Sequence, residues 1–244
     1  ARSGYLRVKR VLDVLAAAIL LVLTAPVMLA VAVTVALVMG RPVLFRQPRP
    51  GRGGRLFVLV KFRSMRATGA DRGPADDADR LTPLGRWLRA TSLDELPTLW
   101  NVLRGEMSLV GPRPLPAEYL DRYTPEQFRR HEVRPGVTGL AQVNGRNALS
   151  WEEKFRYDVW YVDNVSFWLD LRILARTVVT VLRRDGIAAP GVATAPEFLG
   201  SAGTPLRGVP ADPHGMPADT HGVAADSGMT TCTGRAKRHE RLTA

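Results

Sequence analysis

Two adjacent carboxylates, Asp94 and Glu95, have the clearest chemical potential in this chain of 244 residues. They lie in the string RATSLDELP (89–97), where Ser92 and Glu95 have the spacing of a helix capping box. One explanation is structural, because carboxylates at a helix N-terminus cap free N–H groups and complement the helix dipole. The other is chemical. An ionised aspartate can attack phosphorus, and a divalent cation can screen the repulsion between two anions.

Basic residues that could receive a phosphate follow an expected strand. Lys61 and Arg63 lie in the string KFRSMR (61–66), and alternate residues of a strand point to the same face. Both cations could therefore meet one phosphate. The alternative is an edge strand whose positive charges are solvated.

Two proline- and glycine-rich strings carry further arginines. Arg113 lies between two prolines in SLVGPRP (108–114), which stiffens the loop and fixes the direction of a guanidinium suited to bidentate phosphate binding. The string RPGVTG (134–139) leads to QVNGRN (142–147), which contains Arg146. Ordinary turn chemistry also explains both strings.

Short elements are expected to position these groups. Alternating apolar residues predict strands, and capping residues at Ser92, Thr124, Ser150 and Ser166 predict helix starts. The expected elements are strands at 43–47 and 56–63 and helices at 84–89, at 92–105, from 124, at 150–162 and at 167–183. Because Pro97 lies just beyond the positions where a helix accepts proline most easily, a shifted or 3₁₀-like start is the alternative for the helix at 92–105. Aromatic residues in the last two helices indicate either core packing or a belt at a membrane interface: Trp151, Tyr157, Trp160, Tyr161, Phe167 and Trp168.

The uncharged run Val14–Met39 predicts a membrane element, since its 26 residues exceed the roughly 20 that span a bilayer as a helix. Basic residues flank both ends, whereas a helix that crosses once leaves its Lys/Arg excess on one side. Pro26 lies near the middle and removes a backbone donor. A re-entrant helix that bends at Pro26 and returns to the same face satisfies all three features. A helix that spans the membrane once, with a tolerated proline, is the alternative.

Composition narrows the class of partner. The net charge of +11 predicts an anionic partner, such as anionic lipid, a phosphorylated small molecule or nucleic acid. The segment 41–66 has eight Lys/Arg and no Asp/Glu directly after the membrane run, which favours a membrane-surface phosphate over nucleic acid. The single cysteine, Cys232, excludes an internal disulfide. Residues 186–244 are rich in Gly and Pro, with Phe198 as their one aromatic residue, and are expected to be disordered.

Five strings in this order resemble the bacterial sugar transferases, or monotopic phosphoglycosyl transferases. The resemblance covers about residues 9–185. Its strings are KFRSM (61–65), TSLDELP (91–97), NVLRGEMSLVGPRP (101–114), RPGVTGLAQVNGRN (134–147) and DVWYVDNVSFWLDL (158–171).

The resemblance implies transfer of a sugar 1-phosphate from a UDP-sugar to polyprenyl (undecaprenyl) phosphate, releasing UMP. It implies that Asp94 is a nucleophile that forms a covalent phosphosugar intermediate. Glu95 assists, and the pair helps to hold Mg²⁺. The substrate-binding residues that it implies are Lys61, Arg63, Arg89, Arg113 and Arg146. The family's re-entrant helix breaks at a Ser-Pro pair, whereas Ala25 precedes Pro26 here, so Thr24 would supply the hydroxyl.

The expected fold is mixed α/β and mainly helical, with a re-entrant membrane helix (1–40), a catalytic domain with a small β-hairpin (41–185) and a disordered tail (186–244). We expect it in the bacterial cell membrane, facing the cytoplasm, at the first membrane step of surface glycan assembly. Glucose, galactose and N-acetylated amino sugars all fit as the sugar. A homo-oligomer or downstream glycosyltransferases are further partners to test. The rival function is a non-catalytic membrane-docked scaffold that binds anionic lipid or acidic proteins.

Overall fold

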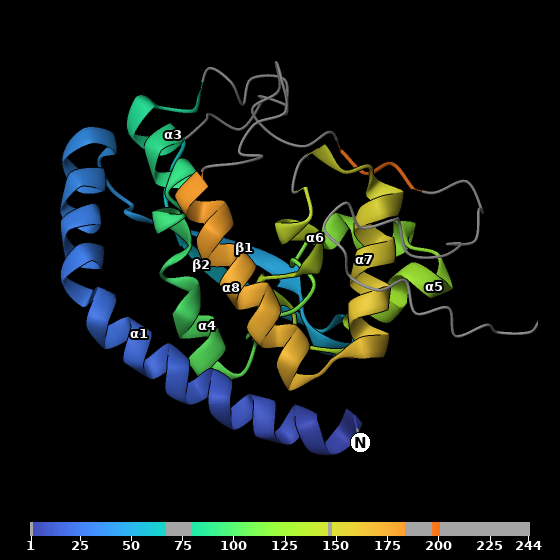
Figure 1. Cartoon of the computed structure of the whole chain (residues 1–244). Coiled ribbons are helices and arrows are strands. Elements are labelled where there is room, and N and C mark those ends of the chain that lie inside the picture. The colour runs from blue at the N-terminus through green and yellow to red at the C-terminus, as the bar shows by residue number, and fades with distance from the viewer. Residues whose placement is uncertain (1, 67–79, 146–147, 184–196, 201–244) are drawn as a thin grey trace, which may run out of the picture.

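The computed structural model describes residues 2–66, 80–145, 148–183 and 197–200. The described part is mainly helical with two small two-stranded sheets, and Figure 1 shows α1 along one side of it and α5, α6 and α7 on the opposite side. The helices and strands are α1 (Arg2–Met39), β1 (Leu44–Pro50), β2 (Leu56–Phe62), α3 (Pro83–Ala90), α4 (Thr98–Arg104), β3 (Ser108–Val110), α5 (Pro125–Phe128), β4 (Gly136–Thr138), α6 (Leu140–Val143), α7 (Trp151–Asn164) and α8 (Phe167–Arg183).

The N-terminal apolar segment forms one continuous helix, α1, with Pro26 inside it. By length and composition, its part Gly4–Met39 could cross a membrane, with a mean hydropathy of 2.7 over its most apolar window. Figure 1 shows α1 curving around the rest of the chain. The Thr24 hydroxyl donates to the carbonyl of Leu20 at 2.7 Å. It therefore does not serve the carbonyl of Val22, which the proline leaves without its usual N–H partner. A hydroxyl bonded in this way also favours a bend.

Both halves of α1 pack against the same body of the protein. In the first half, Ala17 is fully buried in a cluster with Leu99 of α4. In the second half, Val35 is fully buried in a cluster with Leu88 of α3. Each burial removes apolar surface from water or lipid and fixes one half of the helix on the domain.

A buried cluster of charged and phenolic groups ties the start of α1 to α8 and α7. The Asp170 carboxylate accepts hydrogen bonds from Lys9 Nζ at 2.6 Å, from the Tyr5 hydroxyl at 2.5 Å and from the Tyr161 hydroxyl at 2.7 Å. Asp13 of α1 lies 3.9 Å from Lys9 Nζ. We call these residues (Tyr5, Lys9, Asp13, Tyr161 and Asp170) the α1–α8 cluster.

Asp13 also connects α1 to strand β3. Its carboxylate accepts hydrogen bonds from the Ser108 hydroxyl at 2.7 Å and from the Leu109 backbone N–H at 3.1 Å. Because Arg113 follows β3 by only three residues, α1 helps to position the loop that carries this arginine.

The expected hairpin is confirmed. β1 and β2 pair antiparallel from Leu44–Phe62 to Pro50–Leu56, so β1 extends three residues beyond the expected end at 47. Pro48 and Pro50 fall at alternate positions whose backbone nitrogens point away from β2, and the missing N–H groups therefore cost no ladder hydrogen bonds.

The parallel pair β3–β4, which the sequence analysis did not predict, joins the two glycine- and proline-rich strings. Ser108 pairs with Gly136, and Val110 pairs with Thr138. A Cβ atom on Gly136 would lie 2.1 Å from the backbone nitrogen of Gly111, which is too close for any side chain. Close approach of two backbones therefore explains these glycines better than turn chemistry alone.

Most of the predicted helix starts are confirmed. Thr124 and Ser150 both form complete capping boxes, and the Ser166 hydroxyl accepts a hydrogen bond from the Leu169 N–H at 3.4 Å. The helix expected at 84–89 is α3, capped by Thr82. The capping box at Ser92 was wrong, whereas the shifted, 3₁₀-like start that Pro97 indicated is confirmed by the 3₁₀ turn at Leu93–Glu95 and by α4, which begins at Thr98. Ser92 has a left-handed φ of 57° and makes no capping bond.

The aromatic residues of the last two helices divide between the two expected environments. Tyr157 and Tyr161 of α7 belong to the buried core, whereas Phe167 and Trp168 at the start of α8 are 46% and 73% exposed. The core interpretation therefore holds for these two tyrosines of α7, and α8 presents its first two rings to the surroundings.

The expectation of disorder from residue 186 does not extend to residues 197–200. Phe198 is 2% exposed and packs edge-on against Phe155 and Tyr119, with ring centroids 4.9 and 5.6 Å away. Its N–H donates to the Tyr119 hydroxyl at 3.1 Å, and its carbonyl accepts a hydrogen bond from Arg122. The other residues of the expected tail lie outside the described part of the chain.

Candidate active site

The two carboxylates lie on a single 3₁₀ turn, η3 (Leu93–Glu95), between α3 and α4. The left-handed conformation of Ser92 ends the preceding segment, and Pro97 delays the next helix until Thr98. The Thr98 hydroxyl donates to the Glu95 carbonyl at 2.6 Å and so fixes the turn from its C-terminal side. A non-glycine residue with positive φ is held by its surroundings at some cost, and such residues cluster at functional sites.

Glu95 is held between two cations. Its Oε1 accepts hydrogen bonds from Lys61 Nζ at 2.6 Å and from Arg113 Nη2 at 2.7 Å. Burial alone would raise the pKa of Glu95, but the positive charges and hydrogen bonds of Arg113 and Lys61 outweigh it and hold the pKa well below its usual range. Glu95 is therefore a permanently ionised, immobile group.

Asp94 is different, because its carboxylate has no hydrogen-bond or ion-pair partner within the described ranges. The residue is only 7% exposed. Burial and the charge of Glu95 raise the pKa of Asp94 to about 6, against the opposing charges of Lys61, Arg89 and Arg113. Near pH 7 this carboxylate is mostly ionised and poorly solvated, which are the properties of a reactive nucleophile.

The structure separates the predicted basic residues. Lys61 and Arg113 meet at Glu95, and Arg89 lies close enough to affect the charge on Asp94 while its Nε donates to the Ser64 hydroxyl at 3.0 Å. Arg63 is 8% exposed and donates to the backbone carbonyls of Met39 and Gly40, at the C-terminal end of α1. Lys61 and Arg63 therefore do not converge on one phosphate here. Arg146 lies outside the described residues.

A pocket opens at Glu95, and its walls contain Lys61, Glu95 and Arg113. Asp94, the residue before Glu95, is not among the described residues that line it. Arg49 of β1 also lines this pocket, although the sequence analysis did not select it. The available signal was the run of eight basic residues without an acidic one in 41–66. That run contains so many cations that composition alone does not single out Arg49.

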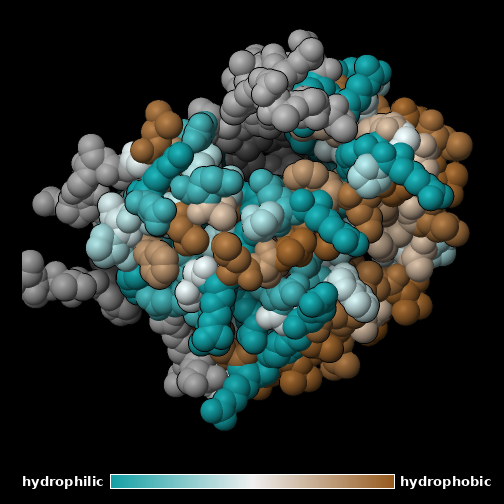
Figure 2. Space-filling model, turned by 180° about the vertical axis from the view of Figure 1, so that it is seen from behind, coloured by the Kyte–Doolittle hydropathy of each residue, from teal (hydrophilic) through white to brown (hydrophobic). Residues whose placement is uncertain are grey.

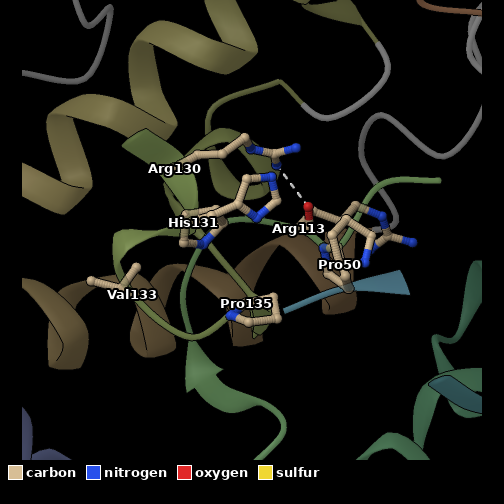
Figure 3. A pocket seen from close by; sticks show the side chains of 8 residues that line it. Pro50, Arg113, Arg130, His131, Val133 and Pro135 are labelled. Atoms are coloured by element: carbon tan, nitrogen blue, oxygen red, sulfur yellow. Dashed lines mark hydrogen bonds between the residues drawn. The ribbon is translucent and has the colours of Figure 1, made fainter. Parts of the chain in front are cut away.

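Arg130 supports the Arg113 loop from behind, and the sequence analysis missed it too. Its Nη2 donates to the Arg113 carbonyl at 2.7 Å and to Asp158 of α7 at 2.7 Å. Figure 3 shows Arg130 and His131 beside the Arg113 backbone in a small proline-walled pocket. The buried charge of Arg130 is compensated by Asp158, whose pKa burial raises to about 6. A buried ion pair thus fixes the backbone that carries Arg113.

Comparison with known proteins gives a consistent set of relatives. The sequence model for bacterial sugar transferases matches residues 4–184. The chain is 53% identical over 194 residues to the uncharacterized sugar transferase EpsL of Bacillus subtilis (strain 168), covering 79% of this chain and 96% of that protein.

Two further relatives have names that state a reaction. The chain is 48% identical over 188 residues to the UDP-glucose:undecaprenyl-phosphate glucose-1-phosphate transferase of Caulobacter vibrioides, covering 72% of this chain and 70% of that protein. It is 42% identical over 191 residues to the UDP-N-acetylgalactosamine-undecaprenyl-phosphate N-acetylgalactosaminephosphotransferase of Aeromonas hydrophila, covering 75% of this chain and 45% of that protein.

Proposed function

The chain belongs to the bacterial sugar transferase family, and from that premise we propose that it transfers a sugar 1-phosphate from a UDP-sugar to undecaprenyl phosphate, releasing UMP. The enzyme is a transferase of substituted phosphate groups. The observation that carries the detailed proposal is the contrast within the carboxylate pair. Asp94 is buried without a partner among the described residues, next to Glu95, which pairs with two cations.

The proposed reaction has two phosphoryl-transfer steps. In the first, an Asp94 carboxylate oxygen attacks the phosphorus that bears the sugar, and the bond from that phosphorus to the bridging oxygen breaks. UMP leaves with that oxygen, and the sugar phosphate stays on Asp94 as an acyl phosphate. In the second, a phosphate oxygen of the lipid carrier attacks the same phosphorus and displaces the Asp94 carboxylate. The product is a polyprenyl-diphosphate-linked sugar.

The surrounding cations supply what phosphoryl transfer needs most, which is charge stabilisation and orientation. The hydrogen bonds to Glu95 orient Arg113 and Lys61 and hold their charges at the pocket wall, although the Arg113 side chain is 45% exposed. Glu95 acts as the positioning group for both cations. Arg89 lies on the side of Asp94 and favours its ionised form.

The carboxylate pair fits a Mg²⁺ ion only in part. Within the described ranges there is no group of three or more His, Cys, Asp or Glu side chains that could hold a metal. Mg²⁺ often takes one or two carboxylates together with substrate phosphate oxygens and waters, so a larger protein cluster is not required. Asp94 has an unpaired carboxylate to offer, whereas Glu95 already binds two cations. Bound there, the ion would neutralise charge on the diphosphate.

A re-entrant membrane helix is the topology that we propose for α1. Contacts of Ala17 and Val35 with one domain support it, because a helix that spans a bilayer cannot place both halves on a body that lies at one face. Between these contacts, Val22 and Leu23 are 75% and 69% exposed, which suits insertion into lipid. Figure 2 shows apolar side chains along the edge of the molecule where α1 lies. The exposed Trp168 suits the headgroup zone.

We further propose that the catalytic domain faces the cytoplasm of a bacterial cell, where nucleotide sugars are made, and that the reaction begins surface glycan assembly. The named relatives use different sugars, so glucose and N-acetylgalactosamine donors both belong in the first tests. Labelling of single cysteines placed at residues 4 and 52 in sealed vesicles tests the topology. Access to both from the same side supports the re-entrant helix, and access from opposite sides contradicts it.

The decisive experiment for function is a UMP-release panel. The full chain in lipid nanodiscs is given undecaprenyl phosphate and, in turn, UDP-glucose, UDP-galactose, UDP-N-acetylglucosamine and UDP-N-acetylgalactosamine. We expect rapid UMP release with at least one donor and a loss of about 1,000-fold or more in Asp94→Asn, because removal of a nucleophile typically costs at least that factor. Binding of lipid without turnover of any donor would support the scaffold function instead.

A further inference from the structure

Arg49 lines the pocket at Glu95 but has no part in the mechanism above. It is a residue of strand β1, far in sequence from the carboxylate pair, and lines the same pocket as Lys61 and Arg113. The pocket therefore has a third cation in its wall, contributed by the hairpin.

The hydrogen-bonding of Arg49 is incomplete. Its Nη2 donates to the Gln47 side chain at 2.6 Å, whereas its buried Nε has no partner among the described residues. No ion pair joins Arg49 to a carboxylate within the part of the chain that the structure describes. Lys61 and Arg113, in contrast, both have Glu95 as counter-ion. Arg49 is thus the pocket cation with an unused donor and no counter-ion of its own.

An arginine with an unused donor and no ion-pair partner lowers the stability of the ligand-free protein. Burial, followed by repulsion from Arg113, lowers the pKa of Arg49 to about 10. A partly buried charge without an ion-pair partner destabilises the folded protein, and an anion that entered the pocket would relieve that cost. A guanidinium also presents its N–H groups in a fork that matches two oxygens of one phosphate.

We propose that Arg49 binds a phosphate group of a substrate in this pocket. The identity of the phosphate rests on the proposed function, because both substrates of that reaction carry one. The group is either the nucleotide phosphate of the UDP-sugar, which leaves as UMP, or the phosphate of the lipid carrier. Within the described residues Arg49 forms no ion pair, although the charge of Glu118 favours its ionised form, so its guanidinium can act on the substrate directly.

The test compares Arg49→Gln with Arg46→Gln in the full chain. Arg46 is the matched control because it lies on the same strand, is exposed, and points to the opposite face. UMP and inorganic pyrophosphate are titrated onto each protein in nanodiscs by calorimetry, and KM is measured separately for the UDP-sugar and for undecaprenyl phosphate. Arg49→Lys is a second variant, which keeps the charge but loses the fork.

We expect Arg49→Gln to weaken UMP or pyrophosphate binding about 10- to 100-fold, the range for a lost charged hydrogen bond, and Arg46→Gln to change it less than about twofold. A higher KM for the UDP-sugar assigns the phosphate to the nucleotide, and a higher KM for the lipid assigns it to the carrier. The affinity of Arg49→Lys for UMP or pyrophosphate should fall between those of the unsubstituted protein and Arg49→Gln.

Arg49→Gln should also unfold at the same temperature as the unsubstituted protein or higher, because it removes a charge that lacks a counter-ion. The proposal is overturned if a folded Arg49→Gln binds both anions and shows both KM values like Arg46→Gln. Failure of the proposed function, with no UMP release from any donor, leaves the pyrophosphate titration as an independent readout of Arg49.

Discussion

The active-site pair and the α1–α8 cluster are both buried groups of opposite charges, but they differ in how completely the charges are paired. In the α1–α8 cluster, Asp170 accepts hydrogen bonds at both carboxylate oxygens, from a lysine and two tyrosines. In the active site, Glu95 accepts two charged hydrogen bonds at one oxygen, whereas Asp94 has no partner within the described residues. Asp170 and Asp13 are therefore paired at both oxygens, Glu95 at one, and Asp94 at neither.

The difference shows how burial can serve two purposes in one molecule. A buried carboxylate that accepts hydrogen bonds at both oxygens fixes the relative position of the elements that it joins, here α1 and the rest of the domain. A buried carboxylate without partners contributes nothing of this kind and costs stability, so its retention indicates chemistry. Variants of the two clusters should consequently separate stability from activity.

Asp170→Asn should have the largest effect on stability. It removes the negative charge opposite Lys9 and leaves that ammonium group buried with a weaker partner, which typically costs about 3–5 kcal/mol. Chemical unfolding in detergent measures the change. Asp94→Asn is the matched control, and its free energy of unfolding should stay within about 0.5 kcal/mol of the parent or rise. Equal losses in both variants would remove the distinction between the clusters.

His131 is a second buried titratable group, like Asp94, with an unpaired side-chain atom: its Nε2 has no partner among the described residues. Its contribution to stability should depend on pH. Burial and the charge of Arg130 lower the pKa of His131 to about 4. Between pH 6.5 and 4 the unfolded chain takes up a proton that the folded protein does not, so stability falls as the pH falls. The full effect is about 3 kcal/mol.

His131→Asn should remove that loss and so flatten the pH dependence of unfolding over this interval. Asp158 contributes with the opposite sign, since its raised pKa lets the folded protein take up a proton before the unfolded chain does. The contribution of His131 is therefore the difference between the free energies of unfolding of the variant and of the unsubstituted protein at each pH. Parallel profiles for the two proteins would show that His131 is not a buried neutral group.

Phe198 extends the comparison from charged to apolar anchors. Phe198→Ala should lower the free energy of unfolding by about 2 kcal/mol, the value of burying one such side chain. Leu199→Ala is the matched control, because Leu199 is 81% exposed and should change stability by less than about 0.5 kcal/mol. Thermal unfolding of both variants measures the effect. Identical midpoints would mean that the docking of residues 197–200 contributes no stability.

Local signals predicted most of the fold that positions the site. Capping boxes at Thr124 and Ser150 and the alternation in 56–63 depend on a few neighbouring residues, so they could be read directly. The Ser92 signal failed because Pro97 follows too closely for a regular helix, and the chain instead makes a 3₁₀ turn. The parallel β3–β4 pair joins segments that no local pattern connects.

Within the site, the sequence identified the groups but not their pairing. The contact of Lys61 and Arg113 with one oxygen of Glu95 depends on three separate elements. The Arg63 side chain points to the C-terminal end of α1, because the backbone carbonyls there lack helical N–H partners and need other donors. Nothing in the sequence indicated that Phe198 is buried, because its partners Tyr119 and Phe155 lie far away along the chain.

The most direct test of the account is to trap the intermediate on the protein. The full chain is incubated without lipid carrier, with each UDP-sugar labelled in the sugar, and is then quenched, digested and analysed by mass spectrometry. The account predicts up to one equivalent of UMP and a sugar phosphate on the peptide that contains Asp94, absent in Asp94→Asn. If UMP appears only when the carrier is present, and no peptide is ever labelled, the two-step reaction through Asp94 is contradicted.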